Sequence, residues 1–207
     1  MQKLLCSAYL PPISFFTAIC NGGDVVFEQY DNYRKQTYRN RCAIATSNGR
    51  QILTIPVEKT ESPKQLMKDV RISDHGDWRH LHWNALEAAY MNSPFFIYYQ
   101  DDFRPLYDKK FNFLLDFNIE LTKVMIDLIG IKTNIRLSDS YEQTVKDTID
   151  FRNLIEPDYT ISDGIQPYYQ VFKQKNGFIG NLSIIDLLSN MGPESLLILR
   201  NGANKLL

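Results

Sequence analysis

The first sixty residues alternate between short apolar runs and turn residues, a pattern typical of β-strands. The apolar run "KLLCSAYL" stops at Pro11-Pro12, and "SFFTAIC" then predicts a short helix before a glycine pair. "DVVFEQY" is rich in β-branched and aromatic residues and predicts a second strand. Two more strand-like runs flank Asn48-Gly49, a dipeptide that strongly favours a hairpin turn.

The middle of the chain has helical periodicity instead. One helix is predicted to end at Asn92-Ser93-Pro94, because apolar positions recur with the required spacing at Trp78, Leu81, His82, Ala85, Leu86 and Ala89. A second periodic stretch predicts one long helix over residues 102–130, with Pro105 in its first turn and Gly130 at its end.

The last third mixes both patterns. "KTNIRLSDS" predicts a strand, residues 141–155 are weakly helical, and residues 157–164 have the composition of a loop. Near the end, "QPYYQVF" predicts a strand and "LSIIDLLSNMG" a helix that Gly192-Pro193 terminates. This order predicts one α/β or α+β domain over residues 1–207, with N-terminal strands including a hairpin, a central helical region and a C-terminal strand-helix segment.

Composition excludes several classes of protein. With 23 Lys and Arg against 24 Asp and Glu, the chain has no overall field to hold a polyanion, which disfavours nucleic-acid binding. The three cysteines have no metal-ligand spacing, so no metal site is expected and a reduced compartment fits best. The apolar start is interrupted by Pro11-Pro12, which opposes an export signal and favours a cytoplasmic location. No apolar run reaches the length of a membrane span.

Motifs of common enzyme classes are missing. The sequence has no P-loop, no dinucleotide fingerprint, no serine-hydrolase elbow and no H-E-x-x-H. It names no cofactor and fixes no oligomeric state.

One segment stands out by its charge. Residues 30–41, "YDNYRKQTYRNR", place four cations between two predicted strands, where loops commonly carry function. Arginine forks suit phosphates and carboxylates, and neutral donors add hydrogen bonds, so the candidate substrate-binding residues are Arg34, Lys35, Tyr38, Arg39, Asn40 and Arg41. The alternative is a solvated connector whose charges pair with nearby acids.

His82 is the candidate catalytic group. Its imidazole titrates near working pH, so it is suited to general acid or base chemistry. Its place on the apolar side of a helix, between Trp78 and Leu86, equally suits a hydrogen-bonded core residue.

Several segments together resemble the WbqC-like family of bacteria, in the form common in Bacteroidetes. They occur in family order and are "AYLPPISFF", "DNYRKQTYRNRC", "LTIPV", "KDVRIS", "HWNALEAAYMNSPFFIYYQDDF", "LLDFN" and "NLSIIDLL". The front departs from the commoner form of the family, in which glutamine-proline precedes an aromatic residue and a proline-tryptophan pair.

The resemblance implies a role in surface polysaccharide (O-antigen-type) biosynthesis, with glycyl or other aminoacyl transfer to a sugar suggested for the family. We therefore expect a cytoplasmic transferase that binds a sugar nucleotide or another small molecule through the basic segment. The alternatives are a non-catalytic binding or assembly protein and a nucleotidyltransferase-like enzyme, although the H-x-G-H pattern of the latter is missing.

Overall fold

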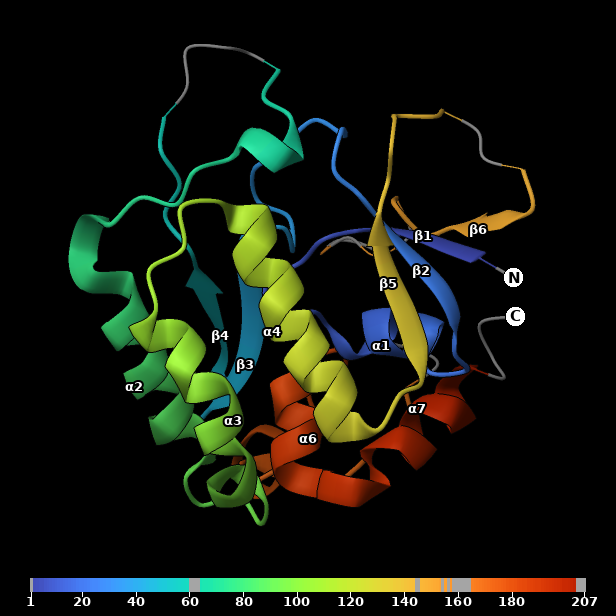
Figure 1. Ribbon diagram of the computed structural model, residues 1–207. Coiled ribbons are helices and arrows are strands. Elements are labelled where there is room, and N and C mark those ends of the chain that lie inside the picture. The colour runs from blue at the N-terminus through green and yellow to red at the C-terminus, as the bar shows by residue number, and fades with distance from the viewer. Residues whose placement is uncertain are drawn as a thin grey trace.

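A computed structural model describes residues 2–59, 64–143, 146–153, 155, 157 and 165–203 (Figure 1). Four parallel strands form its main sheet in the order β5-β2-β1-β6. Their bounds are Gln2–Cys6 for β1, Gly23–Glu28 for β2, Thr133–Leu137 for β5 and Thr148–Asp150 for β6. The expected α/β class is confirmed.

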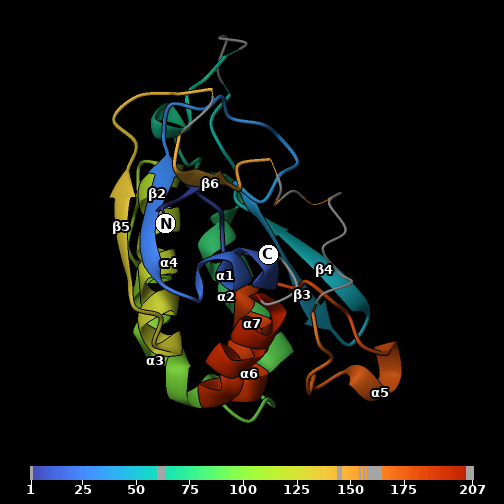
Figure 2. The same ribbon diagram turned by 90° about the vertical axis from the view of Figure 1, so that its right-hand side faces the viewer.

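Helices cover one face of this sheet. The register pairs Leu5 with Phe27 and Phe27 with Leu137, so these side chains point to the same side. Helix α1 (Ile13–Ile19) packs there, with the Phe15 and Phe27 rings 6.0 Å apart. Figure 2 shows α1, α4 and the C-terminal helices gathered beside the sheet.

The predicted hairpin is confirmed as strands β3 (Arg41–Thr46) and β4 (Gly49–Thr54), which pair antiparallel. The amide of Ser183 donates to the Ala43 carbonyl at 2.8 Å, which ties the hairpin to the start of helix α6 (Ile184–Met191). The hairpin thereby encloses the core on the side away from the main sheet.

Two helices replace the single helix predicted over residues 102–130, and that prediction is wrong. After α2 (Trp78–Tyr90), α3 covers Phe96–Asp108 and α4 covers Leu114–Ile129. Between α3 and α4 the backbone pairs with residues 70–72: the Ile72 amide donates to the Asn112 carbonyl, and the Leu114 amide to the Val70 carbonyl. These bonds interrupt the helical ladder despite the periodic apolar side chains, and Pro105 lies inside α3.

The C-terminal part also differs from expectation. Strand β6 occupies part of the stretch predicted to be weakly helical. Of the loop predicted over residues 157–164, residues 158–164 lie outside the described residues. The described residues 165–172 contain no strand; instead the Gln170 side chain accepts from the Ile179 amide and donates to the Ile179 carbonyl. This side chain makes the bonds that a neighbouring strand would make. The predicted helix is confirmed as α6, and it follows a single turn, α5 (Lys173–Asn176), and precedes α7 (Ser195–Ala203).

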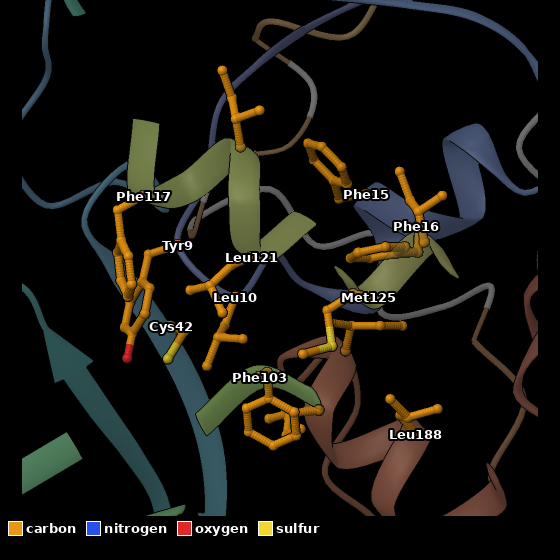
Figure 3. Close-up of a cluster of buried hydrophobic side chains, with 14 of the residues drawn as sticks. Tyr9, Leu10, Phe15, Phe16, Cys42, Phe103, Phe117, Leu121, Met125 and Leu188 are labelled. Carbon is orange, nitrogen blue, oxygen red and sulfur yellow. The ribbon is translucent and has the colours of Figure 1, made fainter. Parts of the chain in front are cut away.

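Side chains from four helices meet in one core. Figure 3 shows Leu121 and Met125 of α4 packed among Phe16 of α1, Phe103 of α3 and Leu188 of α6. All five are fully buried. Helix α4 therefore anchors both the sheet side and the hairpin side of the molecule.

Asn118, on the buried side of α4, connects this helix to the basic segment. Its Nδ2 donates to the Arg39 carbonyl at 2.8 Å, and the residue is fully buried. Asn118→Leu keeps the branching and the number of side-chain heavy atoms but leaves that carbonyl unpaired, so the free energy of unfolding should fall by about 1–3 kcal/mol.

Urea denaturation measures this loss. Asn84→Leu is the matched control, because Asn84 is exposed on α2 and bonds only the exposed His80 side chain in its own helix. Equal stability of the two variants would contradict the assigned role of Asn118.

Candidate functional site

The strand order creates a switch point between β1 and β6. From β1 the chain moves to β2 and then to β5 on one side, and later returns to add β6 on the other side of β1. Open parallel sheets bind ligands beyond the carboxyl ends of their strands at such a point. The carboxyl ends of β1 and β6 are therefore the first place to look for a site.

A cavity lies at that place. It encloses about 290 Å³ up to its mouth, but only about 10 Å³ admits the centre of a water molecule. Its lining comes from the end of β1, from α1, from the basic segment and from the end of β6, and consists of Leu5, Cys6, Ser7, Ala8, Phe15, Thr37, Tyr38, Arg39, Phe151, Arg152 and Ile155. The interior has room for about one water molecule, so a whole sugar nucleotide does not fit inside it.

Ser7 brings an unused hydroxyl to this cavity. The residue is 1% exposed, and its Oγ has no hydrogen-bond partner among the described residues. A buried hydroxyl without a partner costs free energy. A ligand atom inside the cavity would remove that cost.

The backbone just after Ser7 is strained. Leu10, fully buried between β1 and α1, has a φ of 37°, a left-handed conformation that a branched side chain rarely adopts. The Ser183 hydroxyl donates to its carbonyl at 2.8 Å and helps to hold this shape. Strain of this kind concentrates at functional sites.

Of the cations in the basic segment, only Arg39 lines the cavity. Its guanidinium is almost completely buried and donates to Asp31 Oδ2 at 2.5 Å, to Cys6 Sγ at 3.0 Å and to Thr37 Oγ1 at 3.4 Å. Its charge is therefore already balanced by an internal acid, as the connector alternative expects.

The other candidate residues divide into two groups. Tyr38 lines the cavity. Arg34 Nη2 donates to Asn153 Oδ1 at 3.0 Å, and Lys35 is exposed. Asn40 and Arg41 lie outside the lining. Asn40 Nδ2 donates to the Ile55 carbonyl at 2.9 Å, and Arg41 begins β3 opposite Thr54.

Arg152 closes the β6 side of the site. Its guanidinium bonds Asp150 and the carbonyls of Glu142 and Gln143, and its Nη1 lies 3.6 Å from Glu28. These bonds hold the end of β6 in place against the end of β2.

Cys6 is unsuited to nucleophilic chemistry. Burial raises the pKa of its thiol to about 12, even though the nearby Arg39 charge opposes that shift. The thiolate form needed for attack is therefore scarce near neutral pH.

His82 lies in the aromatic core rather than in the cavity lining. It is 7% exposed, and its Nδ1 lies 2.9 Å from the Tyr9 hydroxyl, which is 2.8 Å from the Tyr107 hydroxyl. The Trp78 ring packs edge-on against the imidazole with centroids 5.3 Å apart. This geometry favours the core interpretation of His82 over the catalytic one.

Comparison with known proteins agrees with the resemblance seen in the sequence. Residues 7–156, more than half of the chain, match the WbqC-like protein family. The chain belongs to this family. An uncharacterised protein of Mycobacterium tuberculosis, Rv1507c, is 28% identical over 215 residues, covering 91% of this chain and 93% of the relative. The search of solved structures gives no match.

Membership of the WbqC-like family suggests a role in polysaccharide-related biosynthesis. Within the described part of the chain, no helix has the length and apolarity needed to cross a bilayer. The same residues contain no group of three or more His, Cys, Asp or Glu arranged to hold a metal ion.

Sequence reasoning on this WbqC-like chain missed Ser7 and Arg152. Ser7 directly follows the first strand, so a hydroxyl at a strand end was a visible signal. Arg152 gave none, because its place depends on β6 pairing with β1 across more than a hundred residues.

Two buried groups make the stability of this WbqC-like chain depend on pH. Burial lowers the pKa of His82 from 6.5 to about 4, although an interaction with the Thr54 backbone opposes this shift. The unfolded chain binds this proton below pH 6.5 but the native state does not, so the free energy of unfolding falls by up to about 3 kcal/mol as pH drops towards 4.

Asp186 has the opposite effect. Burial raises the pKa of its carboxyl from 3.8 to about 6, although hydrogen bonds from Tyr168, Gln170 and Tyr90 oppose the shift. The native state then binds a proton between pH 6 and 3.8 that the unfolded state does not, so this contribution to stability increases as pH falls. Urea denaturation at several pH values in this range gives the slope of the free energy of unfolding against pH. This slope should change in opposite directions in His82→Gln and Asp186→Asn. Slope changes of the same sign would contradict these assignments.

Proposed function

We propose that this protein is a transferase of surface polysaccharide biosynthesis that moves a small acyl or aminoacyl group to a sugar, with the reacting group held at the cavity between β1 and β6. The observation that carries this proposal is that Ser7, which lines a narrow cavity at the switch point, has a buried hydroxyl without a partner. Family membership supplies the polysaccharide context.

The cavity is too small for a whole acyl group, so only the carbonyl oxygen of that group would enter it. Its interior admits little more than one water molecule, so the bulk of any donor or acceptor must lie outside the mouth. Leu5, Ala8, Phe15 and Phe151 give it largely apolar walls. Such walls exclude water and protect an activated acyl group from hydrolysis.

In the proposed reaction, Ser7 donates a hydrogen bond to the carbonyl oxygen of the acyl group. The acceptor's amine or hydroxyl forms a bond to the carbonyl carbon, the bond to the donor's leaving group breaks, and the acceptor's proton ends on that leaving group. Negative charge develops on the carbonyl oxygen during this attack, so a fixed donor there lowers the barrier. Arg34 and Lys35, exposed just before the lining residue Thr37, would contact an anionic part of the donor.

Ser7→Ala tests this function in the bacterium that makes the protein. A strain lacking the protein should make polysaccharide whose repeat unit has lost the mass of a small acyl or aminoacyl substituent, as measured by mass spectrometry. Wild-type protein should restore the substituent and Ser7→Ala should not, because the variant cannot hydrogen-bond the carbonyl.

Ser14→Ala is the matched control. Ser14 is 2% exposed and its Oγ also has no partner among the described residues, but it lies outside the cavity lining. Neither substitution leaves another group without a hydrogen-bond partner, so each should change the free energy of unfolding by less than about 0.5 kcal/mol. An unaltered polysaccharide mass in the deletion strain would overturn the proposal, and loss of the whole polysaccharide would favour an assembly protein instead.

A further inference from the structure

Strand β5 is an open edge of the main sheet. It pairs with β2 on one side, and within the described part of the chain no strand pairs with its other side. Figure 2 shows β5 at the outer margin of the sheet. The unused amides and carbonyls of such an edge form a template on which another strand can pair.

The sequence of β5 does little to protect this edge. Edge strands are commonly kept from pairing by a proline, a bulge or several charged side chains. The strand reads "TNIRL" and contains no proline, and its register with β2 runs residue for residue from Thr133 to Leu137 without a bulge. Arg136 is its one charged residue, so the edge is free to pair with a further strand.

Apolar side chains along this edge are only partly covered. Ile135 and Leu137 turn to the helix side of the sheet, because they pair with the buried Val25 and Phe27. Ile135 is half-buried and Leu137 is 37% exposed. Between them and α4 lies a groove of about 1250 Å³ up to its open side, of which about 700 Å³ admits the centre of a water molecule. A second surface placed against this edge would remove both side chains from water, which is favourable.

The charge of the groove indicates what kind of surface fits it. Its charged lining residues are Lys109, Lys110, Lys123, Arg136, Asp116 and Glu120. Two more acids lie just outside the lining: Asp74 pairs with Lys110. Asp139 Oδ2 lies 3.9 Å from Arg136 Nη1. Four cations thus face four acids, so the groove selects neither an acidic nor a basic peptide and suits a surface with the same mixture of signs. A second copy of the chain has that mixture, and its net charge of -1 causes little repulsion between copies.

The side chains of β5 also match those of a second β5. In an antiparallel pair about a two-fold axis through Ile135, Leu137 faces the partner's Thr133 and Arg136 faces the partner's Asn134. Asn134 Nδ2 donates to Asp24 Oδ1 at 3.3 Å, so the partner's Arg136 also approaches an acid. An axis through Arg136 would instead place two guanidiniums opposite each other, which is unfavourable. Charge therefore favours the axis through Ile135.

We infer that this protein forms a two-fold symmetric dimer in which the β5 strands of two copies pair antiparallel and join the two main sheets into one. The grooves of the two copies then face each other across the axis, and Ile135 and Leu137 become covered. Strand β2 separates β5 from β1, so the cavity that Ser7 lines stays outside the interface. The dimer is therefore independent of the proposed function and is tested separately.

Sedimentation velocity over a range of protein concentrations tests the dimer. Wild-type protein should sediment as a dimer, and Leu137→Lys should raise the dissociation constant by about tenfold or more, because the two-fold axis brings the new charge into the interface twice. Leu81→Lys is the matched control: Leu81 is 59% exposed on α2, outside β5 and its groove, so this variant should dimerise like the wild type.

An exchange of charges tests the register. Asn134→Lys places a cation opposite the partner's Arg136, and Arg136→Glu places an acid near the partner's Asp24, so each should weaken the dimer by about threefold to tenfold. The double variant should regain most of the lost affinity, because each introduced lysine faces an introduced glutamate. Both residues are exposed, so all three variants should keep the thermal stability of a folded monomer.

The inference is overturned if the wild type remains a monomer at every concentration, or if Leu137→Lys dimerises as tightly as Leu81→Lys. A monomer whose β5 amides shift in NMR spectra on addition of an acidic peptide would likewise overturn it, in favour of a different occupant of the edge. A double variant that dimerises no better than the weaker single variant would refute the pairing about Ile135.

Discussion

Burial of the Arg39 guanidinium is the constraint on which the site depends. A buried cation must be paired and hydrogen-bonded, and Arg39 meets this need with Asp31, Thr37 and Cys6. Because Cys6 ends β1 and Asp31 follows β2, the charge fixes the basic segment against the carboxyl end of the sheet. Removing Asp31 would leave the buried Arg39 charge without its acid, whereas Asp31 itself is partly exposed to solvent.

This constraint changes the meaning of the basic segment. A run of four cations suggests a surface that holds phosphate, but its most buried member serves the fold and brings Tyr38 and Thr37 into the cavity wall. The members left on the surface are Arg34 and Lys35. The segment therefore has a buried part that serves the fold and an exposed part whose binding role stays a prediction.

The aromatic core explains why His82 occupies its position. The Tyr107, Tyr9 and His82 side chains form a buried series of hydrogen bonds. A neutral imidazole takes part in this series without bringing a charge into the core. The series connects α2, α3 and the loop that follows β1, and so supports the backbone next to Ser7.

The sequence by itself determined the local elements whose signals are local. The β-branched run of β2, the hairpin around residue 48, helix α2 and helix α6 all follow from periodicity, turn chemistry and caps within a few residues. It also singled out residues 30–41 by their charge, and Thr37, Tyr38 and Arg39 of that segment line the cavity. Tertiary structure decided the rest: the break between α3 and α4 comes from backbone bonds to residues 70–72, and the switch point exists only because β6 pairs with β1. The burial of Arg39 and the unpartnered hydroxyl of Ser7 likewise depend on residues distant in the chain, because solvent exclusion and hydrogen-bond pairing are properties of the packed molecule.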